Sequence, residues 1–222
     1  MNGMENSLAH AALMDATYRH QRLFYDLTRR YYLLGRDRLI ARLAPPPGSR
    51  ILEIACGTGR NLDRIGRTYP ECRLYGLDIS EEMLRSARTK LDGTAALAQA
   101  DACRFDSARL FGVAGFDRIV LSYSLSMIPD WHGALAEAAR HLASGGELHI
   151  VDFGTQSGLP NWFRTGLRAW LRKFHVTPRD DFGSVLTCVA DETGSTAQTE
   201  SLYRGYAQSG VLMRRREIGA QF

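Results

Sequence analysis

The chain has 222 residues, of which 45% are hydrophobic and 23% are charged. This composition is typical of one soluble globular domain, and it excludes a disordered chain, a collagen-like repeat and a small disulfide-rich scaffold. No run of residues reaches the roughly 18 apolar positions that a membrane-spanning helix needs, and the first residues lack the pattern of a secretion signal. We therefore expect a cytoplasmic protein.

The net charge of +4 comes from the first 50 residues, which contain eight arginines and four acidic residues. The planar guanidinium group of arginine binds carboxylates and phosphates through two hydrogen bonds. A GC-rich genome would produce the same excess of arginine. The four cysteines are too far apart in sequence for a paired metal motif, so we expect neither structural zinc nor disulfides.

Predicted helices and strands alternate along most of the chain. Residues 12–43 have helical spacing of apolar side chains, with an interruption near Gly35, and prolines end the helix at 45–47. Residues 50–55 form a short, branched apolar run that is typical of a buried parallel strand. The next predicted elements are a helix at 61–68, a strand at 73–77, a helix at 81–91 capped by Ser80, a strand at 95–99, a short helix or loop at 105–110, a strand at 116–123, a helix at 132–142, a strand at 146–153 and a helix at 180–193.

This order predicts an α/β fold with a doubly wound, mostly parallel, seven-stranded sheet. The last two strands, at 197–203 and 206–213, flank Gly205 and predict an antiparallel hairpin at one edge of the sheet. We divide the chain into an N-terminal helical extension, or substrate cap, at 1–48 and a sheet domain at 49–222. An amphipathic insert at about 158–176 belongs to the second part.

A glycine-rich loop follows the first strand, at the sheet edge where open parallel sheets bind ligands. Gly57 and Gly59 let the backbone pass close to a ligand and lead into a helix N-terminus. Leu62 stands where a dinucleotide-binding fingerprint has its third glycine, and Glu53 would repel a pyrophosphate. A cofactor with an amino group and a sulfonium but no phosphate fits better, and S-adenosylmethionine is such a molecule.

Polar residues also follow the next three strands. Asp78 can accept hydrogen bonds from ribose hydroxyls, and Asp101 can accept one from an adenine amine. Each acid taken singly can instead be a helix cap or a loop residue, but four strand ends in order favour a cofactor site. The predicted cofactor-binding residues are Glu53, Ala55, Cys56, Gly57, Thr58, Gly59, Asn61, Asp78, Ile79, Met83, Asp101, Ala102 and Ser122.

These motifs, spread over about residues 50–154, resemble those of the class I S-adenosylmethionine-dependent methyltransferases. The resemblance implies a Rossmann-like fold, S-adenosylmethionine as cofactor and methyl transfer as the activity. One position departs from the family pattern, because Ala55 stands where the family commonly has glycine.

Two segments outside the motifs carry information about the methyl acceptor. Residues 18–38 contain six arginines and four tyrosines. In residues 162–174, pairs of apolar residues recur every four positions beside a stripe of arginines, as in helices that lie at a membrane interface. The aromatic residues of this helix can also pack against the sheet or a dimer partner.

The runs at 31–40, 57–61 and 201–206 resemble the bacterial diacylglyceryl-homoserine N-methyltransferases of betaine-lipid synthesis. The resemblance implies three methylations of one lipid amine, which give diacylglyceryl-N,N,N-trimethylhomoserine. It also implies a membrane lipid substrate and peripheral association with an anionic membrane surface, at the inner face of the cell membrane. The alternatives are a phosphatidylethanolamine N-methyltransferase, a soluble small-molecule or quinone methyltransferase, and a cofactor-binding protein without catalytic activity.

Tyrosines can surround an amine that becomes a fixed cation, since each ring attracts positive charge. We predict Tyr25, Tyr32 and Tyr123 in catalytic positions. The predicted substrate-binding residues are Tyr18, Arg30, Tyr31 and Arg36. Either arginine can pair with a homoserine carboxylate, and the sequence does not choose between them. We expect no metal site and no nucleic-acid partner, and the oligomeric state stays open.

Overall fold

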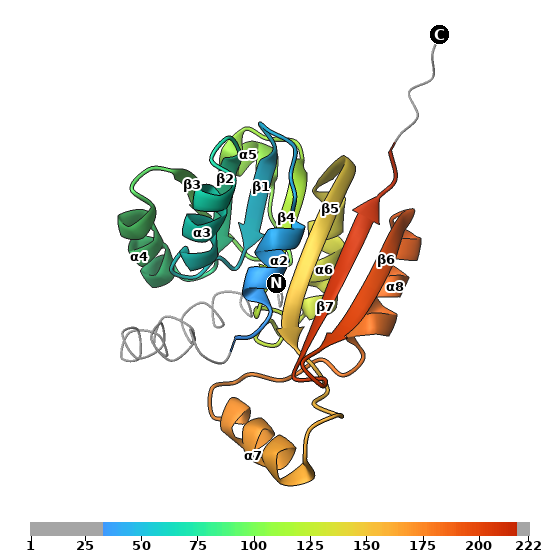
Figure 1. The fold of residues 1–222 in the computed structure, drawn as a ribbon. Helices are drawn as coiled ribbons and strands as arrows, with labels where there is room; N and C mark the ends of the chain where they lie inside the picture. Colours follow the sequence, from blue (N-terminus) through green and yellow to red (C-terminus); the bar gives the residue numbers. More distant parts are fainter. Residues whose placement is uncertain (1–32, 217–222) are drawn as a thin grey trace, which may run out of the picture.

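The fold is a seven-stranded sheet with helices on both faces (Figure 1), seen in a computed structural model that describes residues 33–216. The strands are β1 (Arg50–Ile54), β2 (Arg73–Asp78), β3 (Ala95–Gln99), β4 (Phe116–Ser122), β5 (Leu142–Phe153), β6 (Ser195–Leu202) and β7 (Ala207–Arg214). The helices are α2 (Arg36–Arg42), α3 (Arg60–Thr68), α4 (Glu81–Leu91), α5 (Ser107–Phe111), α6 (Trp131–Arg140), α7 (Asn161–Arg172) and α8 (Phe182–Glu192).

The strand order is β3-β2-β1-β4-β5-β7-β6. The first five strands are parallel, whereas β7 runs antiparallel between β5 and β6. The predicted doubly wound sheet and its C-terminal edge hairpin are therefore confirmed. The chain reverses its direction of travel across the sheet between β1 and β4, where sheets of this type bind ligands.

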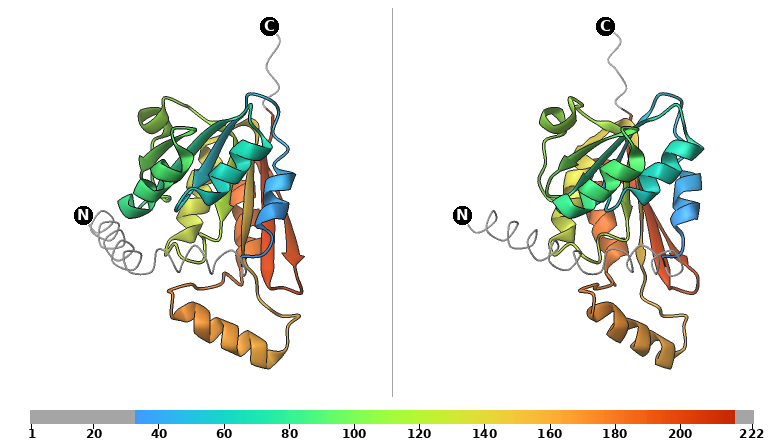
Figure 2. Two further views of the ribbon diagram at one scale, coloured as in Figure 1. Left: turned by 60° about the vertical axis from the view of Figure 1, so that its left-hand side comes forward. Right: turned by 90° about the vertical axis from the view of Figure 1, so that its left-hand side faces the viewer.

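Two apolar clusters fill the space between the sheet and its helices. Alternate strand residues point to opposite faces, so Ile51 of β1 joins the cluster with α2, α3 and α4, while Leu52 joins the cluster with α6 and α8. Figure 2 shows these two helical layers on opposite sides of the sheet. Burial on both faces explains why the parallel strands are continuous apolar runs.

The described part of the predicted N-terminal extension packs on the sheet domain. Gly35, with φ of 90°, precedes α2, so the chain is not helical at the position of the predicted break; residues 12–32 lie outside the described part of the chain. The guanidinium of Arg118 in β4 donates a hydrogen bond to the carbonyl of Leu43 at 2.7 Å. The hydroxyl of Tyr69 donates one to the carbonyl of Ile40 at 2.9 Å. Residues 33–48 and the sheet thus form one packing unit.

The start of β5 differs from the prediction. The helix expected at 132–142 ends at Arg140, and the strand expected to begin at 146 begins at Leu142. Leu142 pairs with Phe116 before the register shifts, and a Cβ on Gly146 would lie 2.8 Å from the Phe116 carbonyl oxygen. Glycine therefore permits a bulge that extends the strand, and this bulge was not visible in the apolar pattern.

The segment that leaves β5 toward α7 passes close to the β6–β7 turn. The amide of Gly154 donates to the carbonyl of Tyr206 at 3.0 Å. A Cβ on Gly154 would overlap the Gly205 carbonyl oxygen and lie 3.0 Å from the carbonyl atoms of Ala207. These neighbours are backbone atoms in paired segments, so they cannot move aside without breaking hydrogen bonds.

We expect Gly154→Ala to lower the free energy of unfolding by about 1–3 kcal/mol, the usual cost of overpacking. Gly183→Ala in α8 is the matched control, because the nearest atom to its added Cβ lies 3.8 Å away and alanine favours the helix. Chemical denaturation measures both values. Equal stability of the two variants would contradict the close approach at Gly154.

Candidate functional site

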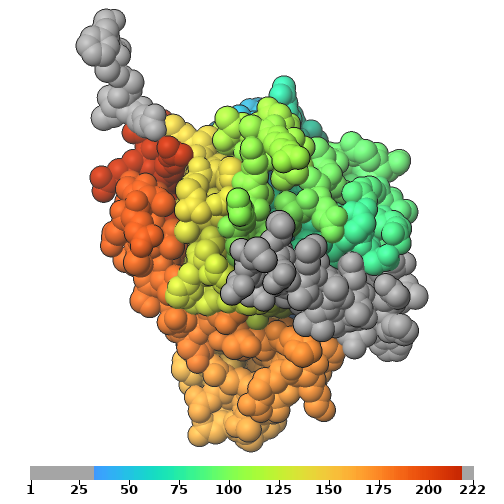
Figure 3. All heavy atoms as spheres, turned by 180° about the vertical axis from the view of Figure 1, so that it is seen from behind, coloured from blue at the N-terminus to red at the C-terminus, as the bar shows by residue number. Residues whose placement is uncertain are grey.

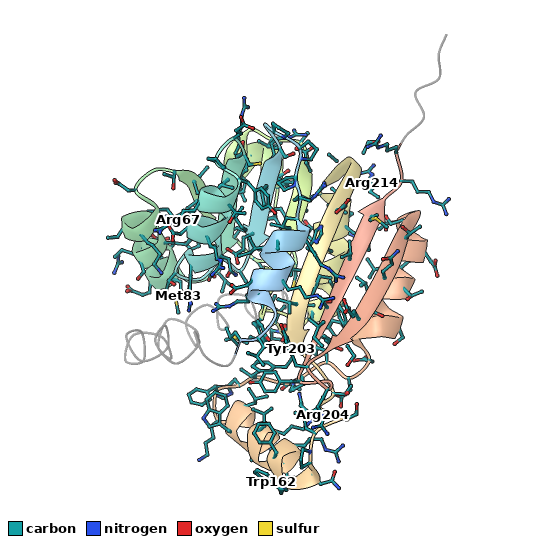
Figure 4. The ribbon with its side chains drawn as sticks, in the orientation of Figure 1. Arg67, Met83, Trp162, Tyr203, Arg204 and Arg214 are labelled. Atoms are coloured by element: carbon teal, nitrogen blue, oxygen red, sulfur yellow. The ribbon has the colours of Figure 1, made fainter. Side chains whose placement is uncertain are left out.

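The carboxyl ends of the parallel strands meet at one edge of the sheet and bring the predicted site residues together. Met83, at the start of α4, lies at this edge, as does the chain that leaves β5 toward α7 (Figure 4). The residues that follow β1, β2 and β4 form the walls of the site. Their contacts define which of them can reach a ligand.

The carboxylate of Asp78, at the end of β2, connects two of these walls. Its Oδ2 accepts a hydrogen bond from the amide of Gly57 at 2.8 Å, and its Oδ1 accepts one from the amide of Ser80 at 2.9 Å. The Ser80 hydroxyl accepts from the Met83 amide at 3.3 Å and caps α4 as predicted. A carboxylate offers about four acceptor sites, so these two bonds are compatible with additional bonds from ribose hydroxyls.

The two glycines of the loop after β1 have different roles. Gly57 has φ of 55°, and a Cβ there would meet nothing within 4 Å, so the backbone borders open space. A Cβ on Gly59 would lie 2.8 Å from the Leu91 side chain of α4, and the Gly59 amide donates to the Cys56 carbonyl at 3.0 Å. Gly57 suits a ligand contact. Gly59 also allows α3 to approach α4.

Two other predicted loop residues turn their side chains toward the protein. Cys56 is buried in the apolar cluster on the α3 face. The Thr58 hydroxyl is buried and accepts a hydrogen bond from Lys90 Nζ at 3.1 Å. These side chains shape the loop, so a contact of Cys56 or Thr58 with the cofactor would come from the backbone.

Glu53 is the most perturbed acid of the site. Its side chain is only 2% exposed; Oε1 accepts a hydrogen bond from Asn61 at 2.7 Å, while the buried Oε2 has no hydrogen-bond partner. Burial raises the pKa of Glu53 from 4.5 to about 8, although the Asn61 bond and the charge of Arg36 oppose the shift. A buried acceptor without a donor is costly. An ammonium group on a ligand would satisfy it, so this site fits the amino group of S-adenosylmethionine.

An apolar group lines the other end of the site. Met83 is buried and packs with Ile79 and Met127, so the three can cover the faces of a base. The Asp101 carboxylate accepts a hydrogen bond from the Cys103 amide at 2.9 Å and thereby stabilises its own turn. The Ala102 side chain is buried in the core cluster on the α6 face, so its predicted contact with the cofactor would involve the backbone.

Ser122 and Tyr123 end β4. The Ser122 hydroxyl is buried without a hydrogen-bond partner. Tyr123 has φ of 55°, and its hydroxyl donates to the Leu34 carbonyl at 2.5 Å. Burial raises the pKa of Tyr123 well above its usual value. This hydroxyl therefore anchors the segment before α2, and only the ring of Tyr123 is left for the predicted catalytic position.

The sequence analysis missed a buried acid at the end of β5. Asp152 accepts hydrogen bonds from the amides of Ser126 at 3.0 Å and Phe153 at 2.7 Å. The guanidinium of Arg179 donates to the carbonyls of Leu125 at 3.0 Å and Ile128 at 2.7 Å, in the same loop. Together these bonds fix the loop after β4. The sequence feature that could have indicated Asp152 is the presence of an acid inside the apolar run at 148–153.

The acceptor side of the site is described in part. Arg36 begins α2, and its positive charge opposes the rise in the pKa of Glu53 and of Tyr123. Tyr18, Tyr25, Arg30, Tyr31 and Tyr32 lie outside the described residues. Within residues 33–216, no three histidine, cysteine or acidic side chains gather as a metal site requires, and no helix is long and apolar enough to cross a membrane.

Ala55 adopts φ of 55° where the family commonly has glycine. Left-handed backbone costs a residue with a Cβ roughly 1–2 kcal/mol. We expect Ala55→Gly to raise the free energy of unfolding by about 0.5–1 kcal/mol after the added freedom of the unfolded chain is counted. Ala169→Gly, in the interior of α7, is the control and should be destabilising. A loss of stability in both variants would contradict the strain at Ala55.

The raised pKa of Glu53 gives the free protein a pH-dependent stability. Between pH 4.5 and about 8 the folded chain keeps a proton on Glu53 that the unfolded chain has lost, so this stabilising contribution falls as pH rises through the interval. Glu53→Gln should flatten that dependence. Denaturation of both proteins at several pH values measures the difference, and parallel curves would show that Glu53 ionises normally.

The comparisons with known proteins agree with this geometry. Residues 51–146 match the family model described as "Methyltransferase domain". The chain is 34% identical over 155 residues to the ubiquinone/menaquinone biosynthesis C-methyltransferase UbiE of Dinoroseobacter shibae, a match that covers 68% of this chain and 59% of that protein. The chain thus spans less than two thirds of the length of this relative.

Solved structures show the same fold at low sequence identity. The plantazolicin methyltransferase BpumL, solved with S-adenosylhomocysteine, has a TM-score of 0.70 at 18% identity, with coverage of 96% of this chain and 98% of that one. Phosphoethanolamine N-methyltransferase 2 of Haemonchus contortus, solved with S-adenosylmethionine, has a TM-score of 0.63 at 14% identity, with coverage of 82% and 52%. These structures show that the chain has the fold of class I methyltransferases.

Proposed function

We propose that this chain transfers the methyl group of S-adenosylmethionine to an acceptor carried in a membrane. The observation that supports the donor side best is Glu53, whose buried Oε2 lacks a donor next to a loop that borders open space at Gly57. An ammonium group would favour loss of the Glu53 proton and form a charge-assisted hydrogen bond with the resulting carboxylate. The sulfonium of the cofactor supplies the activated methyl group.

The residues of the chain act by binding and orientation. Glu53 and Asn61 hold the amino group, Asp78 holds the ribose, and the cluster around Met83 covers the base. The bound cofactor would supply its methyl group to an amine nitrogen or to an electron-rich ring carbon of the reduced quinone, with the C–S bond breaking as the new bond forms and the acceptor's proton passing to solvent. Placing the two partners at attack distance supplies most of the acceleration.

The acceptor depends on parts of the chain outside the family match. That match ends at residue 146, so it includes β1–β4 and leaves out α2, α7 and the C-terminal hairpin. Specificity resides in such added parts. The comparisons support donor chemistry more directly than they support any acceptor.

Two acceptors have separate support. A quinone ring carbon is favoured by the sequence similarity to the relative named for ubiquinone and menaquinone biosynthesis. The amine of diacylglyceryl-homoserine, methylated three times, is favoured by the resemblance of the runs at 31–40 and 201–206. Arg36 belongs to the first of these runs, and an arginine can pair with a homoserine carboxylate.

The test is transfer of a labelled methyl group to four acceptors: a demethylated quinone, diacylglyceryl-homoserine, phosphatidylethanolamine and a soluble amine. We expect one of the lipid-borne acceptors to be labelled. Labelling of the soluble amine alone would overturn the membrane-borne acceptor, and cofactor binding without any transfer would overturn the enzyme assignment.

Asp78→Asn should weaken cofactor binding by about 10- to 100-fold through lost charge-assisted bonds.

Arg36→Gln separates the two acceptors. If the substrate is diacylglyceryl-homoserine, KM for that lipid should rise roughly 10-fold, as expected for one lost charged pair, while KM for phosphatidylethanolamine changes little. Arg42→Gln is the control, since Arg42 pairs with Glu200. A weaker cofactor affinity in Arg36→Gln with unchanged acceptor KM would assign Arg36 to the cofactor instead.

A further inference from the structure

The two halves of α7 have different surroundings. Leu171 is buried, and Leu167, Trp170 and Phe174 pack beside it against the core cluster on the α2 face. The rings of Trp170 and Phe174 lie 5.0 Å apart. The apolar stripe expected along the whole helix is therefore occupied by the protein itself in the second half only.

The first half of α7 exposes large aromatic side chains. Trp162 is 77% exposed and Phe163 is 38% exposed, and their rings meet edge to face at 5.8 Å. Figure 4 places Trp162 on the part of α7 farthest from the sheet, and Figure 3 shows this helix within a lobe that projects from the body of the molecule. Adjacent exposed aromatics on a projecting element are typical of an interaction site.

The charge around these aromatics has one sign. Residues 154–179 contain five basic residues and no acidic residue. Two of the five are engaged, since Arg168 pairs with Asp180 at 2.7 Å and Arg179 bonds to backbone carbonyls. Arg172 and Lys173 are exposed and have no acidic partner among the residues that the structure describes. The lobe is therefore basic as well as aromatic.

The β6–β7 turn adds a second pair of such side chains. Tyr203 is 50% exposed, Arg204 is exposed, and both adopt left-handed backbone with φ of 52° and 59°. The Arg204 carbonyl accepts a hydrogen bond from the Gly158 amide at 3.1 Å, in the segment that leads into α7. This bond holds the turn next to the segment that leads into α7, and Figure 4 shows Tyr203 and Arg204 at the end of the sheet that faces this helix.

We propose that this surface, made of Trp162, Phe163, Tyr203, Arg204, Arg172 and Lys173, binds an anionic lipid bilayer. Tryptophan and tyrosine prefer the headgroup boundary, and each basic residue near the surface attracts anionic lipid. The combination of exposed aromatics with basic residues, and without acids over residues 154–179, matches the interface of an anionic bilayer. The inference deepens the proposed function and rests on it, because α7 follows β5 at the edge that holds the donor site.

Vesicle flotation tests the proposal with the full chain. We expect the protein to float with vesicles of equal parts phosphatidylglycerol and phosphatidylcholine and to stay behind with phosphatidylcholine alone. Trp162→Ser combined with Phe163→Ser should reduce the vesicle partition coefficient about 10-fold or more. Trp170→Ser is the matched control on the same helix, with an expected loss of thermal stability but unchanged flotation of the folded fraction.

Three results would overturn the membrane proposal. They are no flotation of the wild type with anionic vesicles, undiminished flotation of the double variant, and equal binding to neutral vesicles. A dimer that sediments as such and dissociates on substitution of Trp162 and Phe163, without vesicle binding, would assign the surface to a second copy of the chain. Calorimetry with S-adenosylmethionine tests the donor site separately, so failure of docking and failure of the proposed function are distinguishable.

Discussion

The carboxylate of Asp78 is the interaction on which the site depends. It receives the Gly57 amide from the loop after β1 and the Ser80 amide from the start of α4. A buried charged acceptor forms stronger hydrogen bonds than a neutral one, so the two loops are fixed relative to each other before a ligand arrives. The position of Met83 follows from the same contact, because Ser80 caps its helix. A site built in this way loses little entropy when the cofactor binds.

A second set of bonds connects the donor site to the parts that surround the acceptor. Tyr123 ties the end of β4 to Leu34, two residues before Arg36, while Asp152 and Arg179 fix the loop that follows β4. The segment before α2 is therefore held against the end of the strand next to the donor site. This coupling runs through hydrogen bonds to the backbone, which tolerate little displacement.

The sheet, its order of elements and the acids at the strand ends could be predicted because they follow from local patterns and from one rule of parallel sheets. Contacts between residues far apart in the sequence could not be predicted in this way. The role of Gly59 depends on Leu91 in the next helix, and Ala102 turns out to be core because of what α6 places against it. Helical periodicity showed that α7 is amphipathic, but the division between Trp162 and Trp170 required knowledge of what lies beside each ring.

The hydrogen bonds between residues 154–158 and the carbonyls of Arg204, Gly205 and Tyr206 join two stretches of chain that are far apart in sequence. Neither stretch can lengthen or shorten alone without losing these bonds. Insertions that reshape the helical lobe should therefore be inherited together with matching changes in the hairpin. Divergence toward new acceptors would then change the lobe and the β6–β7 hairpin together, while strands β1–β4 and their loops stay the same.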